Sequence, residues 1–163
     1  MDLYAENILD HFRHPRNFEP ILEPTVEHEE WNHACGDSLH IFLQLEGGKI
    51  TNVGWTGTGC AISQASMSIL SEELSGMSED EALKLAKDDI YKMLGVPVGP
   101  RRFKCALMSL HTVKNAVLKA QGKALQGWTE TVALSGEAPN SKQQARLPDG
   151  QAPKKSQIPN ANF

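Results

Sequence analysis

The chain has 163 residues, 40% of them hydrophobic and 22% charged, which is enough for one globular domain with a core and too little for two of full size. Its 20 acidic side chains outnumber its 16 basic ones, so the overall charge does not attract nucleic acid or anionic lipid. No apolar run approaches the roughly 20 residues of a membrane-spanning helix, and the N-terminus lacks a basic and apolar leader, which predicts a cytoplasmic protein.

The N-terminal part is predicted to contain one short helix and one strand. Tyr4, Ile8 and Phe12 recur every four residues, the spacing of one helix face. Pro15 ends this run, because the residue before a proline is disfavoured in the helical conformation. An irregular connector follows, and residues 26–31 are predicted to form an edge strand.

An antiparallel hairpin is predicted in the middle of the chain. Apolar residues alternate along residues 39–45, and Gly47-Gly48 is a two-residue turn signal before a second strand over residues 49–55. The next stretch, residues 60–74, is rich in small and apolar residues and predicts a helix that its neighbours largely bury. A capping box at residues 78–81 then opens a helix that is predicted to run unbroken to Gly95.

The last predicted helix begins near Phe103 and ends at Gly122. Its core-facing stripe consists of Ala106, Leu110, Val113, Val117 and Ala120. Residues 123–163 are rich in Pro, Gln, Asn, Ser and Gly, and are predicted to be a disordered or partly docked tail. The order of elements predicts an α+β fold with a small antiparallel sheet, in which residues 1–122 form the domain.

The three cysteines are the residues best suited to chemistry. Cys35 follows a predicted strand, Cys60 ends a glycine-rich loop and Cys105 starts the last helix. A helix N-terminus favours thiolate over thiol, so Cys60 and Cys105 are the better nucleophiles and ligands. Arg102 and Lys104 add positive charge beside Cys105.

Asp37 is a fourth candidate ligand, because residues i and i+2 of an extended segment face the same way and Asp37 stands two residues after Cys35. Three thiolates and one carboxylate suit tetrahedral Zn²⁺ or the irons of a small cluster, and the carboxylate is the most replaceable of them. Two alternatives remain: the cysteines are inert buried residues, or the metal is purely structural. The spacings of the three cysteines match no zinc finger.

Other polar residues are weaker candidates. His11 and His14 are predicted to be a solvent-facing pair, whereas His33 is close enough to Cys35 to reach the same site. Tight helix packing explains three serines after Cys60, namely Ser63, Ser66 and Ser68. A metal-dependent hydrolase or deaminase would need a general base beside an open coordination position, and no His-x-Glu pair accompanies any cysteine.

Four motifs occur in one order along the chain. They are Tyr4-x-x-x-Ile8-Leu9-Asp10-His11-x-x-x-Pro15-Arg16-Asn17, Cys35-Gly36-Asp37, Gly57-x-Gly59-Cys60-x-x-Ser63-x-Ala65-Ser66 and Arg102-x-Lys104-Cys105. Together they resemble the iron-sulfur cluster assembly proteins of the NifU N-terminal, IscU and SufU family. The resemblance covers residues 1 to about 122 and implies a three-stranded antiparallel sheet covered by helices.

The resemblance implies that Cys35, Cys60 and Cys105 ligate an iron-sulfur cluster (2Fe-2S or 4Fe-4S) or Zn²⁺. Asp37 is then the carboxylate whose replacement stabilises bound clusters in the family. A cysteine desulfurase is implied as a partner that hands sulfur to Cys105 or Cys60 as a persulfide, and iron-sulfur acceptor or carrier proteins receive the cluster. The chain would be a scaffold rather than an enzyme, and a monomer or weak homo-oligomer.

Departures from the family pattern leave a second function open. Lys104 stands where the IscU branch has a histidine, and residues 95–99 replace its Leu-Pro-Pro-Val-Lys segment. Arg102 and Lys104 are similar to the SufU branch, but the step from Cys60 to Cys105 leaves no room for the insertion that SufU-type proteins carry there. The alternative is a zinc-bound, SufU-like sulfur acceptor that carries a persulfide without building a cluster.

Overall fold

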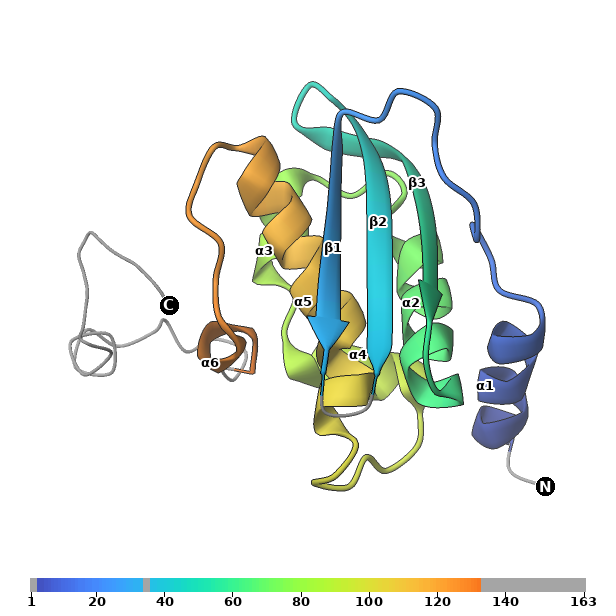
Figure 1. The fold of residues 1–163 in the computed structure, drawn as a ribbon. Helices are drawn as coiled ribbons and strands as arrows, with labels where there is room; N and C mark the ends of the chain where they lie inside the picture. Colours follow the sequence, from blue (N-terminus) through green and yellow to red (C-terminus); the bar gives the residue numbers. More distant parts are fainter. Residues whose placement is uncertain (1–2, 34–35, 133–163) are drawn as a thin grey trace.

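The computed structural model describes residues 3–33 and 36–132, which form an α+β fold (Figure 1). The elements are α1 (Leu3–Arg13), β1 (Val26–Asn32), β2 (Asp37–Glu46), β3 (Lys49–Thr58), α2 (Ala61–Leu74), α3 (Glu79–Lys84), α4 (Lys87–Leu94), α5 (Phe103–Ala120) and α6 (Trp128–Thr131). The strands form one sheet in the order β1-β2-β3, and α2, α4 and α5 lie behind one of its faces (Figure 1). Within the described ranges, no helix has the length and apolar character to cross a membrane.

The predicted edge strand and hairpin are confirmed. β1 pairs antiparallel with β2, which pairs antiparallel with β3. The hairpin turns at Gly47 and Gly48, whose φ angles of 61° and 79° are in the left-handed region that glycine adopts at no steric cost. Leu39, Ile41 and Leu43 of β2 are fully buried, so the alternation read from the sequence marks the face that packs on the helices.

Helix α5 is buried on all sides rather than along one stripe. The predicted stripe is buried from Ala106 to Val117, whereas Ala120 is exposed at the helix end. All residues from 105 to 117 are nevertheless buried, because the sheet covers one side of α5 and α2, α3, α4 and α6 pack on the others. Burial begins at Cys105, which is 6% exposed, whereas Lys104 immediately before it is exposed.

The single helix predicted from Ser78 to Gly95 is wrong, because two helices, α3 and α4, occupy this stretch. The capping box at Ser78 is present as predicted. The chain leaves the helical conformation at Leu85 and Ala86, whose ψ angles are 140° and 169°. The Asp89 carboxylate accepts a hydrogen bond of 2.8 Å from the backbone N–H of Ala86, which satisfies a free donor at the start of a second helix.

The predicted apolar face of the first helix is only partly correct. Ile8 is buried, but Tyr4 is 55% and Phe12 is 37% exposed. His11 is buried instead, which contradicts the prediction of a solvent-facing pair, and only His14 is exposed. Helix α1 packs on α2, where the Ser68 hydroxyl lies 2.7 Å from His11 Nδ1 and satisfies the buried ring.

The chain after α5 folds back along that helix as far as Val132. The Gln126 backbone N–H donates to Asn115 Oδ1 at 2.8 Å, and Asn115 Nδ2 donates to the Gln126 carbonyl at 3.2 Å. The Thr131 hydroxyl lies 2.7 Å from His111 Nδ1. These contacts dock α6 on α5, whereas the predicted tail beyond Val132, residues 133–163, lies outside the described residues.

Acidification from about pH 7.5 to 5.5 is expected to lower the free energy of unfolding. Burial holds the pKa of both His11 and His111 below the ordinary 6.5. The negative charge of Glu30 raises the pKa of His111, but burial has the larger effect. The unfolded chain therefore binds protons more readily in this range, and unfolding gains from acid. Urea titrations should show a weaker pH dependence in His111→Gln. The exposed control His14→Gln should keep the pH dependence of the parent. If the unfolding free energy of His111→Gln depended on pH as strongly as that of the parent, burial of His111 would not be a cause of this dependence.

Candidate metal centre

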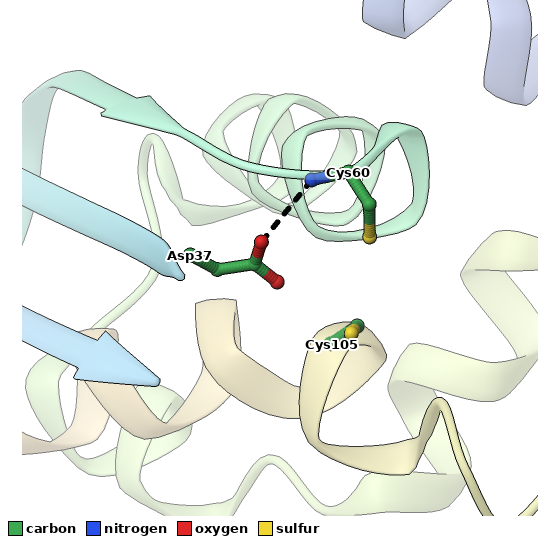
Figure 2. Close-up of side chains that lie close together, drawn as sticks. All are labelled: Asp37, Cys60 and Cys105. Carbon is green, nitrogen blue, oxygen red and sulfur yellow. Dashed lines mark hydrogen bonds between the residues drawn. The ribbon is translucent and has the colours of Figure 1, made fainter. Parts of the chain in front are cut away.

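Three predicted ligands, Asp37, Cys60 and Cys105, meet at one place (Figure 2). Their side chains point toward one another, and a carboxylate oxygen and the two Sγ atoms all lie within 4.8 Å of one another. They come from the start of β2, the residue before α2 and the first turn of α5. Asp37 and Cys105 are buried, whereas Cys60 is half-buried, so solvent or a partner reaches the site at Cys60.

Asp37 is held in place by the turn that leads into α2. It is the first residue of β2 and is 1% exposed. Its Oδ1 accepts a hydrogen bond of 3.2 Å from the backbone N–H of Cys60, the N-cap residue of α2 (Figure 2). This bond satisfies one of the free donors at a helix start and fixes the carboxylate beside the Cys60 side chain.

Two glycines before Cys60 allow the backbone to approach the site closely. A Cβ on Gly59 would lie 2.5 Å from Asp37 Oδ1 and 2.7 Å from Ser63 Oγ. Its φ of 151° is also one that other residues rarely adopt. A Cβ on Gly57 would lie 2.4 Å from the Ser38 carbonyl oxygen of the neighbouring strand. Close packing therefore requires glycine at both positions, against Asp37 for Gly59 and against Ser38 for Gly57.

Both cysteines stand at helix N-termini, as predicted. Cys60 caps α2, and Cys105 is the third residue of α5. The free N–H groups and partial positive charge at such ends favour anionic side chains. Two helix starts therefore meet at one site, and each presents a cysteine there, the residue whose thiolate form binds metals and attacks disulfide bonds.

The donor set fits a thiophilic metal. Ligand atoms around one tetrahedral Zn²⁺ lie about 3.5–3.8 Å apart, so the cluster needs to contract by only about 1 Å. A bound Zn²⁺ would keep the thiolates anionic at neutral pH. Cys35 lies outside the described residues, so its role as a further ligand stays a prediction. The described chain resumes at Gly36, which has a left-handed φ of 73° and donates its N–H to the Asn32 carbonyl at 2.8 Å, immediately before Asp37.

The remaining predicted residues lie around this cluster without joining it. His33 is exposed and stacks on Trp31 at a centroid distance of 6.4 Å. Arg102 is the exposed N-cap residue of α5. Lys104 is exposed, and its ammonium lies 5.7 Å from the centroid of the Trp128 ring.

Sequence reasoning missed one contact of a ligand and one contact of the residue beside a ligand. Ser63 was explained by packing, and it is indeed buried, but its Oγ lies 3.8 Å from Cys60 Sγ, within hydrogen-bond distance for sulfur. Its position three residues after a helix cap was the available signal. Trp128 reaches Lys104 from the C-terminal segment, and no local pattern indicates that contact.

Comparisons with known proteins show which family the chain is similar to. The family model described as the NifU-like N terminal domain matches residues 3–126. A zinc-dependent sulfurtransferase SufU of Bacillus subtilis is 29% identical over 137 residues, covering 74% of this chain and 92% of that protein. An iron-sulfur cluster assembly enzyme IscU of Drosophila melanogaster is 33% identical over 119 residues, covering 71% of this chain and 76% of that protein.

A solved structure with a similar fold comes from Fervidobacterium islandicum. It is a candidate iron-sulfur cluster assembly scaffold protein for the SUF system, with a TM-score of 0.62 and 26% sequence identity. The match covers 69% of this chain and 94% of that one. The three-stranded sheet with its helices is therefore shared with a structure of this type.

Proposed function

The chain belongs to the NifU-like N-terminal domain family, and from this premise we propose that it is a scaffold for iron-sulfur cluster assembly. It receives sulfur from a cysteine desulfurase, assembles a labile cluster from this sulfur and iron, and passes the cluster to acceptor proteins. The observation that carries the proposal is the convergence of Asp37, Cys60 and Cys105 within 4.8 Å. Because the site uses free thiols, we place its action in the reducing environment of the cytoplasm.

Sulfur enters this site through the more accessible thiol. Cys60 is half-buried, whereas Cys105 is 6% exposed. The Cys60 thiolate attacks the outer sulfur of the desulfurase persulfide, so a new S–S bond forms on Cys60, the old one breaks, and the desulfurase thiolate leaves. Cys105 can then take the outer sulfur from Cys60 by the same exchange. Release of the sulfur as sulfide requires two electrons from an external reductant.

A second candidate function keeps the same ligands but carries only the persulfide. The observation that favours it is Lys104, whose ammonium has no lone pair to offer a metal next to Cys105. The similar Bacillus subtilis protein is named a zinc-dependent sulfurtransferase. In this version Asp37, Cys60 and Cys105 would hold Zn²⁺, and one thiolate would leave the metal when the desulfurase docks and accept the sulfur.

Anaerobic reconstitution is expected to separate the two functions. Ferrous iron, cysteine and a desulfurase should produce thiolate-to-iron charge-transfer absorption if the chain is a scaffold, and the Cys60→Ser variant should lack that absorption. A zinc-bound sulfur acceptor should instead retain stoichiometric zinc, stimulate desulfurase turnover and develop no such absorption. If neither the absorption nor the stimulation appeared, both functions would be excluded.

A further inference from the structure

A chain of aromatic and charged contacts connects the C-terminal segment to the metal centre. We call residues 126–132 the docked segment. Within it, Trp128 stacks on His111 of α5, with ring centroids 4.2 Å apart and planes inclined by 16°. The Lys104 ammonium lies 5.7 Å from the centroid of the same Trp128 ring, a distance at which a cation is attracted to an aromatic face. Lys104 immediately precedes the ligand Cys105.

Polar contacts of the residues on both sides of Trp128 hold the docked segment on α5. Thr131 is fully buried, and its hydroxyl lies 2.7 Å from His111 Nδ1 and accepts a hydrogen bond of 2.7 Å from Gln126 Nε2. The Gln126 backbone is held by the two hydrogen bonds of the Asn115 amide. The docked segment therefore presents the ring at a defined position on α5 and not as a freely moving side chain.

The Lys104 ammonium can lie either over the Trp128 ring or near the ligand cluster. Consecutive residues of an α-helix project about 100° apart, so Lys104 and Cys105 leave α5 on different faces. The Lys104 ammonium lies over the Trp128 ring on its own face of α5. Without that ring, the long flexible side chain would be free to bring its ammonium toward the ligand cluster, which is negative because two thiolates and one carboxylate outweigh a single Zn²⁺.

We propose that Trp128 is a positioning residue that holds the Lys104 ammonium on the docked segment and away from the metal ligands. The proposal rests on the proposed function, since it concerns metal held by Asp37, Cys60 and Cys105. An ammonium beside the thiolates would stabilise the negatively charged complex and slow the release of the metal or cluster. Trp128 keeps the complex labile, as transfer to an acceptor requires.

The test is a double-mutant cycle on Zn²⁺ affinity, measured by competition with a chromophoric chelator at low salt. Trp128→Leu keeps an apolar side chain against His111 but removes the aromatic face. It should tighten Zn²⁺ binding by about two- to fivefold, the effect of an exposed charge pair. In the Lys104→Gln background the same Trp128→Leu change should leave the affinity unaltered. Trp128→Phe, which retains an aromatic face, should match the parent.

Three outcomes would overturn the inference. They are a parent-like affinity in Trp128→Leu, weaker binding in that variant, and tightening that persists without Lys104. NMR of the unaltered protein tests the contact without any variant, because the Lys104 side-chain protons should be shifted upfield by the Trp128 ring, and unshifted resonances would also overturn the inference. Failure of the unaltered protein to bind Zn²⁺ or iron would count instead against the proposed function.

Discussion

Replacing Cys105 with serine is expected to weaken Zn²⁺ binding at least about a hundredfold and to abolish cluster assembly. Loss of residues that merely support a ligand costs about 10–100-fold in affinity, and the loss of a ligand itself should cost no less. Cys105 is 6% exposed in the first turn of α5, so a serine at this position would place its hydroxyl at the same site. A protonated hydroxyl is a poor metal ligand. Competition with a chelator gives the affinity, and absorption after anaerobic reconstitution reports the cluster.

A matched control for the Cys105 change is available on the same helix. Met108 is fully buried one turn further along α5, and Met108→Leu conserves volume in the core and removes no ligand atom. This variant should bind Zn²⁺ as the parent does. Parent-like binding in Cys105→Ser would show that Cys105 is an ordinary buried thiol, and the proposed site would then have to be abandoned.

Gly59→Ala is expected to damage both stability and metal binding although Gly59 bears no ligand atom. The added Cβ would lie 2.5 Å from Asp37 Oδ1, and alanine would be strained at a φ of 151°. Crowding of this kind costs about 1–3 kcal/mol of unfolding free energy. Because Asp37 must move to make room, the Zn²⁺ affinity should also fall about 10–100-fold. Urea denaturation and chelator competition measure the two effects separately.

Gly99→Ala is the matched control for the Gly59 change. A Cβ on Gly99 would meet no atom within 4 Å, and this glycine has no φ in the left-handed region. Its substitution should change the unfolding free energy by less than about 0.5 kcal/mol and leave Zn²⁺ binding unaltered. If Gly59→Ala changed the unfolding free energy and the Zn²⁺ affinity as little as Gly99→Ala, the close contact between the Gly59 backbone and Asp37 would not be needed to position the carboxylate.

Local patterns predicted most elements because each depends on residues close together in the chain. Alternation in residues 39–45, the Gly47-Gly48 turn and the capping box at Ser78 were all read correctly. The same reasoning failed where a neighbouring element decided the outcome. His11 is buried because Ser68 of α2 offers it a hydrogen bond, and the helix predicted after Ser78 breaks at Ala86, where Asp89 caps a new start.

The amino-acid sequence by itself determined the candidate ligands and the chemistry available to them. Asp37, Cys60 and Cys105 could be named because thiolates at helix starts and a nearby carboxylate are metal donors wherever they meet. Only the tertiary structure decided that these three meet within 4.8 Å, that Cys60 is more exposed than Cys105 and that Trp128 lies against Lys104. The three residues converge because β2, α2 and α5 pack together. Residue periodicity reports which face of a single element is apolar, so it cannot predict contacts between distant segments.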